Sequence, residues 1–147
     1  MHFLIILANF YDDISKELLS GATKVLDKEK YTYQKITVPG ALEIPATVSY
    51  AADSDIYDGF IALGCVIRGE TIHHEIVAKE CARGLNELAM NLNIAIGNGV
   101  ISAENKKQAI ERAKVSKKNK GGYAANVAIR MAIIQKKFFQ MLKEEEK

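Results

Sequence analysis

The run Phe60-Ile-Ala-Leu-Gly-Cys-Val-Ile67 is the strongest indication of the fold, because none of its residues has a charged or amide side chain. A strand with one wet face alternates apolar and polar residues, whereas an unbroken apolar strand is typical of a parallel sheet that helices cover on both faces. His2-Phe-Leu-Ile-Ile-Leu-Ala8 has the same character near the N-terminus. Two further strands are predicted, at Tyr31–Val38, which is rich in β-branched and aromatic residues, and at Ile94–Ile101.

Segments with a helical spacing of apolar residues separate these strands. We expect Asp12 or Asp13 to cap the first helix and Thr71 to cap the helix that ends near Leu92, because their side-chain oxygens accept bonds from free N–H groups. Further helices are predicted over 41–52, 104–114 and 123–142. The alternation predicts an α/β three-layer sandwich with a four-stranded parallel sheet, flavodoxin-like, in a single domain over residues 1–147.

The amino-acid composition excludes several classes of protein. Of the 147 residues, 48% are apolar and 26% are charged, which excludes a disordered chain. No apolar run approaches the ~20 residues that span a bilayer, and no signal peptide is visible. Only two cysteines occur, Cys65 and Cys81, so we expect a reducing, cytoplasmic setting. The net charge of +2 gives no reason to expect a nucleic-acid or membrane partner.

The small net charge conceals an asymmetry. Residues 1–103 contain 8 basic and 13 acidic side chains, a net charge of −5, whereas residues 104–147 contain 12 and 5, a net charge of +7. The densest part, Lys106–Lys120, has seven cations, one anion and no aromatic residue on which bases could stack. It is either a solvated helix face with its loop or a cationic wall for a phosphorylated small molecule. In the second case Arg112 is the best candidate, because a guanidinium grips phosphate with two hydrogen bonds.

Three predicted strands end in turn-rich segments, over residues 8–11, 38–43 and 65–73. Ligands of open parallel sheets bind outside the carboxyl ends of the strands, so these segments predict the position of a site. In the last segment Gly69-Glu70-Thr71 opens a helix, whose free N–H groups and positive dipole end suit a phosphate. The plainer alternative is that Thr71 only caps the helix. No dinucleotide-binding or P-loop glycine motif occurs.

His73 and His74 are the candidates for acid–base catalysis, since histidine titrates near neutrality. At least one of them is expected to be an exposed side chain without a role. Neighbours on a helix point about 100° apart. The two imidazoles therefore cannot chelate one metal ion, and no partner lies at a zinc-like spacing, so we expect no metal. Cys65 and Cys81 have apolar neighbours and are interpreted as packed core thiols.

Several segments resemble the lumazine synthase family, in matching order over nearly the whole chain. The longest and most specific block is Gly64-Cys-Val-Ile-Arg-Gly-Glu-Thr-Ile-His73. The shorter blocks are Asn9-Phe10, Gly21-Ala22, Val38-Pro-Gly-Ala-Leu-Glu-Ile-Pro45, Asn98-Gly-Val100, Gln108-Ala-Ile-Glu-Arg-Ala113, Asn119-Lys-Gly121 and Ala124-Ala125. The resemblance implies an enzyme of the penultimate step of riboflavin synthesis, without a cofactor. It would condense 5-amino-6-(D-ribitylamino)uracil with 3,4-dihydroxy-2-butanone 4-phosphate to give 6,7-dimethyl-8-ribityllumazine, phosphate and water.

The same resemblance implies roles for individual residues. His73 matches the family's proton-transfer histidine. The residues that match positions binding the pyrimidine and its ribityl chain are Phe10, Ala41, Leu42, Glu43, Cys65, Val66, Ile67 and Asn98. Those that match the phosphate site are Glu70, Thr71, Arg112 and Lys120. In the family, the segments around Asn98 and Arg112 reach in from a neighbouring subunit.

The resemblance further implies small-molecule substrates and a homopentamer, with a 60-subunit shell and contact with riboflavin synthase as open alternatives. Two positions depart from the family pattern: Asn9-Phe10-Tyr11 stands where Arg-Phe-Asn is common, and Asn98 stands where an aromatic residue is frequent. These departures keep open a second function, a non-catalytic lumazine or flavin carrier on the same scaffold. A signalling receiver domain would suit Asp12-Asp13 but is excluded, because no aspartate ends the third strand.

Overall fold

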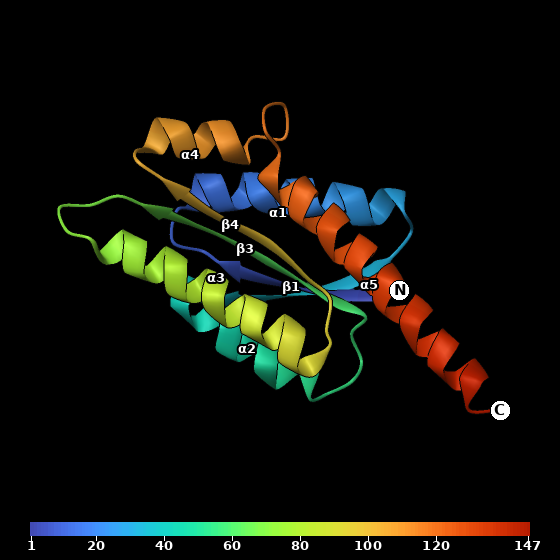
Figure 1. The fold of residues 1–147 in the computed structure, drawn as a ribbon. Coiled ribbons are helices and arrows are strands. Elements are labelled where there is room, and N and C mark those ends of the chain that lie inside the picture. The colour runs from blue at the N-terminus through green and yellow to red at the C-terminus, as the bar shows by residue number, and fades with distance from the viewer.

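The computed structural model describes residues 1–147 and contains one four-stranded sheet (Figure 1). Its strands lie in the order β2-β1-β3-β4, and every pairing is parallel. Their bounds are β1 (His2–Ala8), β2 (Thr32–Val38), β3 (Gly59–Ile67) and β4 (Ile96–Ala103). Because all strands run the same way, their carboxyl ends meet at one edge of the sheet. The predicted α/β sandwich with a four-stranded parallel sheet is confirmed.

Helices cover both faces of this sheet. Their bounds are α1 (Asp12–Lys28), the 3-10 turn η1 (Ala41–Glu43), α2 (Ile44–Ala52), α3 (His73–Leu92), α4 (Lys106–Ala113) and α5 (Lys120–Glu145). Helices α1, α4 and α5 lie on one face, and α2 and α3 lie on the other (Figure 1). The sheet is therefore the middle layer of the sandwich.

The apolar strands are buried on both faces, as their sequence predicts. Alternate residues of β1 point to opposite sides. Phe3 and Ile5 join the core cluster that includes side chains of α1 and α5, whereas Leu4 and Ile6 join the cluster that includes side chains of α2 and α3. None of the four is more than 5% exposed. Burying such a side chain stabilises a fold by about 1.5–3 kcal/mol, so β1 anchors both layers.

The predicted cap of the first helix is wrong. The N-cap residue of α1 is Tyr11, and Asp12 and Asp13 lie in the first turn instead. There Asp12 pairs with Lys16 at 2.9 Å, and Asp13 pairs with Lys106 of α4 at 3.2 Å. Carboxylates in a first turn still face the positive end of the helix dipole, which favours them at this position.

Helix α5 begins three residues earlier than predicted, at Lys120. Two adjacent glycines, Gly121 and Gly122, favour a break in a helix, yet both lie in the first turn of α5. Gly121 allows the backbone of α5 to pass close to α1. A Cβ on Gly121 would lie 2.0 Å from the carbonyl oxygen of Leu18, so only glycine lets α5 cross α1 this closely. The helix starts after Asn119, whose left-handed backbone (φ 47°) turns the chain and whose side chain accepts a hydrogen bond from the N–H of Gly122.

Strand β4 is shifted by two residues from its predicted position. Helix α3 ends at Leu92, as predicted, but Asn93 after it has a left-handed backbone and the N–H of Ile94 still donates to the carbonyl oxygen of Ala89, so the strand begins only at Ile96. Gly97 and Gly99 face α5, where added Cβ atoms would collide with Ala124. Asn98 between them faces the side of α3 and is exposed. β4 is an edge strand, so one side of it has no partner strand within the chain.

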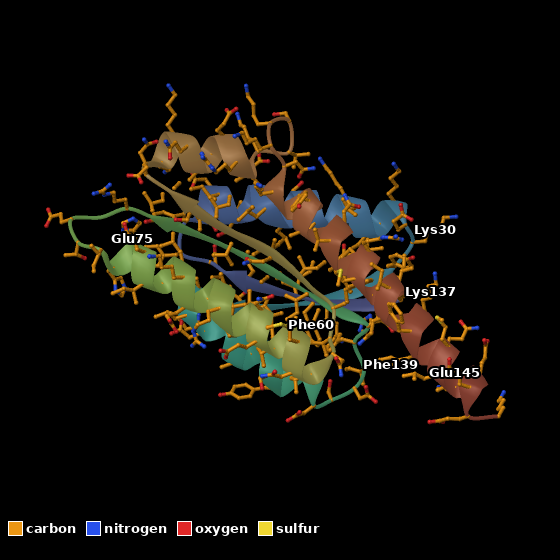
Figure 2. The ribbon with its side chains drawn as sticks, viewed as in Figure 1. Lys30, Phe60, Glu75, Lys137, Phe139 and Glu145 are labelled. Carbon is orange, nitrogen blue, oxygen red and sulfur yellow. The ribbon has the colours of Figure 1, made fainter.

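The far half of α5 projects beyond the sheet (Figure 1). Phe139 and Glu145 mark this part in Figure 2, and Phe138 and Leu142 on it are largely exposed. No helix of the structure combines the length and the apolar character that crossing a membrane requires.

Candidate active site

The carboxyl ends of β1, β2 and β3 border a cavity of about 470 Å³, at the edge of the sheet where the sequence predicts a site. Its walls are the loop between β1 and α1, the segment from the end of β2 through η1, and the end of β3 with the start of α3. Nine predicted site residues line it: Phe10, Ala41, Leu42, Glu43, Cys65, Val66, Ile67, Thr71 and His73. The volume is in the range of small-molecule pockets, about 300–1,000 Å³.

Phe10 and Tyr11 form the aromatic wall of this cavity. Only Asn9 separates them from the end of β1, and α1 begins directly after Tyr11. Phe10 is 71% exposed, which is unusual for so large an apolar side chain, whereas Tyr11 is half-buried. An exposed ring beside a cavity offers a planar ligand a surface for stacking.

The second wall combines backbone groups with one carboxylate. Pro39 and Gly40 end β2, and η1 follows with Ala41, Leu42 and Glu43. Ala41 is buried, whereas Leu42 and Glu43 are exposed. A free carboxylate and nearby peptide groups suit a ligand that is rich in hydroxyl and amide groups, because they accept and donate hydrogen bonds at fixed positions.

The end of β3 forms the third wall, with Cys65, Val66 and Ile67. Burial, with a smaller effect from the Asp13 carboxylate, raises the pKa of the Cys65 thiol to about 11. At neutral pH the thiol is therefore protonated, and a thiol is a poor nucleophile. The prediction of a packed core thiol agrees with this state, and Cys81, which is fully buried under the other layer, likewise has a pKa of about 11.

The start of α3 brings two predicted site residues to the cavity: Thr71, predicted for the phosphate, and His73, predicted for proton transfer. The N-cap residue of α3 is Ile72, so the prediction that Thr71 is the N-cap residue is wrong. Thr71 nonetheless accepts a hydrogen bond on its hydroxyl from the N–H of His73 at 3.3 Å. A Cβ on Gly69 would meet no atom within 4 Å, so the space beside this turn is open. An anion that enters this space would meet the positive end of a 20-residue helix.

The two histidines differ in environment. His73 is exposed and lines the cavity, whereas His74 lines it from a buried position, 8% exposed, with its Nδ1 3.4 Å from the carbonyl oxygen of Thr71. Proton exchange with a ligand needs an accessible imidazole, and His73 provides one. Neither belongs to a group of three or more His, Cys, Asp or Glu side chains that could hold a metal ion.

Four predicted site residues lie outside the cavity lining. Glu70 is exposed on the turn before α3. Asn98 lines a separate groove between β4 and α3 and accepts a hydrogen bond from the N–H of Val100 at 3.0 Å. Neither side chain therefore lines the cavity of its own chain.

The two predicted phosphate cations lie on the other face of the sheet. Arg112 is on α4, where its Nη1 donates to the carbonyl oxygen of Gln108 at 3.2 Å. Lys120 begins α5, with its Nζ 5.1 Å from the centre of the Tyr123 ring. No lysine or arginine lines the cavity. A phosphorylated ligand held by one copy of the chain would therefore meet no cationic side chain in the lining.

Five lining residues were not singled out as site residues from the sequence: Ala8, Tyr11, Pro39, Gly40 and Val77. The rule that ligands bind at strand ends could have found most of them, because they belong to the three turn-rich segments. Val77 could not be found in this way, since its helical spacing predicts only a core position.

Comparison with known proteins gives a consistent result. The family model of 6,7-dimethyl-8-ribityllumazine synthase matches residues 1–136. The 6,7-dimethyl-8-ribityllumazine synthase of Bartonella henselae is 50% identical over 145 residues, which cover 97% of this chain and 94% of that protein. The enzyme of the same name from Bartonella tribocorum is 53% identical over 93% of this chain and 91% of its own length. That of Agrobacterium fabrum is 50% identical over 92% and 95%.

Proposed function

The chain belongs to the 6,7-dimethyl-8-ribityllumazine synthase family, and from this premise we propose how its cavity performs the reaction. It is a transferase of riboflavin biosynthesis, which condenses 5-amino-6-(D-ribitylamino)uracil with 3,4-dihydroxy-2-butanone 4-phosphate. The observation that supports this cavity as the site is that three segments distant in sequence line one hollow of about 470 Å³. Relatives named as synthases cover nearly the whole chain, so a non-catalytic carrier is not favoured.

The pyrimidine substrate would bind between the aromatic wall and the end of β3. Phe10 would stack on the ring, since its side chain is exposed beside the cavity. Backbone groups of Cys65 and Val66 would meet the ring edge, and Glu43 with the peptide groups of Ala41 would hold the ribityl hydroxyls. These groups fix the orientation of the amine, and orientation alone supplies a large part of the acceleration in such condensations.

The phosphate of the second substrate would sit at the start of α3, near Thr71 and Glu70. The helix dipole and a hydroxyl stabilise an anion there, but no cation lines the cavity of the chain. We therefore assign Arg112, together with Lys120, to the cavity of a neighbouring copy, where a guanidinium would stabilise the departing phosphate. This arrangement supports a homopentamer in which Asn98 also approaches from the neighbouring copy.

His73 would transfer the protons that the reaction requires. The amine attacks the ketone and loses water to form an imine, phosphate then leaves, and ring closure expels water. Each step moves a proton, and a positioned imidazole typically contributes about 10²- to 10⁴-fold. Cys65 would not take a chemical role, because its thiol stays protonated at neutral pH. Two buried free thiols also support a reducing compartment, so we assign the protein to the cytoplasm.

The test combines activity with a matched histidine control. Purified protein mixed with both substrates is expected to form the fluorescent lumazine. His73→Ala should lower kcat by about 10²- to 10⁴-fold and leave binding of the product nearly unchanged. His2→Ala, at the opposite end of β1, should leave kcat unchanged. Folded protein without synthase activity would refute the function, and full activity of His73→Ala would refute only the assigned role.

A further inference from the structure

The aromatic wall of the cavity contains a contacting pair of rings. The ring centres of Phe10 and Tyr11 lie 5.0 Å apart, and the ring planes meet at 70°. This is the edge-to-face geometry that aromatic pairs favour, at separations of about 4.5–7 Å. They are the only Phe, Tyr or Trp residues in the lining. We propose that Tyr11 is a positioning residue, which holds the Phe10 ring in the orientation that stacks on the pyrimidine; this rests on the proposed role of Phe10.

Tyr11 is firmly held by the fold. It is the N-cap residue of α1, and its carbonyl oxygen accepts a hydrogen bond from the N–H of Ser15 at 2.8 Å. Its side chain packs against the core cluster that lies under α1 and α5. Both the backbone and the ring of Tyr11 are thus fixed by a long helix and by the core.

Phe10 has no comparable anchor. It is 71% exposed and belongs to neither core cluster. An exposed side chain of this kind samples several rotamers, and ordering it on ligand binding weakens affinity. The Tyr11 ring restricts that freedom before the ligand arrives. In an edge-to-face pair Tyr11 covers at most one face of Phe10, so the other face remains available to a planar ligand.

The contact is made by the two rings and not by a hydrogen bond. Tyr11→Phe should therefore keep the function of the residue, whereas Tyr11→Ala and Tyr11→Leu should lose it. The lost pair interaction corresponds to a rise in the Kd of a stacked ligand of about 2- to 12-fold. Tyr50→Ala is a matched control, because Tyr50 is 75% exposed on α2 and outside the cavity.

The experiment is a double-mutant cycle on the assembled full-length protein, with 6,7-dimethyl-8-ribityllumazine titrated by fluorescence into Phe10→Ala, Tyr11→Ala and the double variant. We expect Tyr11→Ala to raise Kd about 2- to 12-fold when Phe10 is present and to add less than about twofold when Phe10 is absent. Tyr11→Phe and Tyr50→Ala should stay within about twofold of the parent protein. Should Tyr11→Ala fold poorly, Tyr11→Leu takes its place in the cycle.

Any other pattern of Kd values contradicts either the role of Tyr11 or the stacking role of Phe10. If Phe10→Ala raises Kd but Tyr11→Ala and Tyr11→Leu do not, the positioning role is wrong while the proposed site stands. If Tyr11→Ala raises Kd equally with and without Phe10, Tyr11 acts on the ligand or on the loop and not through Phe10, so positioning is again wrong. If Phe10→Ala leaves Kd unchanged, the proposed stacking contact fails, and the role of Tyr11 fails with it.

Discussion

His73→Ala and Arg112→Ala, placed in different copies of the chain, are expected to complement each other. His73 lines the cavity of its own chain, whereas Arg112 lies on α4, on the opposite face of the sheet. If each site takes His73 from one copy and Arg112 from the next, a mixed oligomer contains some sites that have both residues intact. Neither variant alone contains such a site.

The size of the effect follows from the contacts. An interaction of a guanidinium with phosphate contributes about 1.5–3 kcal/mol, so Arg112→Ala alone should lower kcat/KM for the phosphorylated substrate about 10- to 150-fold. In a ring assembled at random from equal amounts of both variants, a site has an intact His73 in half of the cases and an intact neighbouring Arg112 in half. About one quarter of the sites are then complete, so activity should rise to about one quarter of that of the parent protein.

The assay is lumazine formation by oligomers that are unfolded together and refolded as a mixture, with the mixing verified by mass. The matched control pairs His73→Ala with Thr71→Val, because Thr71 and His73 line the cavity of the same chain and cannot complement each other. Verified mixed oligomers of His73→Ala and Arg112→Ala with no gain over the separate variants would refute the shared site.

Three further predictions concern single positions. Arg112→Ala should raise KM for the phosphorylated substrate more than KM for the pyrimidine, and equal changes in steady-state assays would contradict a phosphate contact. Burial raises the pKa of Cys65 and Cys81 from 9.0 to about 11, so their contribution to stability is present below pH 9 and is lost as pH rises through 11. Between pH 9 and 11, the free energy of unfolding measured in urea should therefore fall less for the double variant Cys65→Ala/Cys81→Ala than for the parent protein. The difference should be up to about 2–3 kcal/mol per thiol. The same dependence of unfolding free energy on pH in both proteins would contradict this prediction. Gly121→Ala should lower the free energy of unfolding by about 1–3 kcal/mol or more, because its Cβ would lie 2.0 Å from the carbonyl oxygen of Leu18, whereas Gly69→Ala, with open space around it, should leave Tm unchanged.

The strands and the layer order could be predicted because burial on both faces leaves a direct mark on the sequence. Phe3–Ala8 and Phe60–Ile67 contain no charged or amide side chain, and such runs are typical of parallel strands that helices cover on both faces. Helix starts were predicted less well. At α1 the sequence offers Asp12 or Asp13 as cap, yet the helix already begins at Asp12, and its N-cap residue is Tyr11, which packs against the core.

The role of Gly121 is a second feature that could not be predicted from the sequence. Local rules take Gly121-Gly122 as a break, because glycine weakens a helix. The contact that explains Gly121 is with Leu18, about a hundred residues away in the chain, and no local pattern contains that distance. The sequence also places Phe10 near the site but does not show that the adjacent Tyr11 touches its ring, because packing against the core fixes the direction of the Tyr11 side chain.

The charge asymmetry of the chain gains a geometric meaning from the fold. Residues 1–103, with a net charge of −5, build the entire cavity lining, whereas residues 104–147, with +7, form α4 and α5 on the other face of the sheet. Within one chain the two parts share the core beneath α1 and α5, and three ion pairs join them: Asp13 with Lys106, Arg68 with Glu104, and Asp58 with Lys136. The first two pairs are exposed, and exposed pairs contribute little. The α4 cations and the cation-free cavity are different surfaces of one molecule. Contact between different surfaces of two copies is head-to-tail, and a head-to-tail contact whose rotation closes forms a ring. A ring of this kind would offer the α4 cations of each copy to the cation-free cavity of the next. A chain with the same net charge but interleaved signs would have no such pair of surfaces, so the distribution of charge, and not its total, supports the shared site.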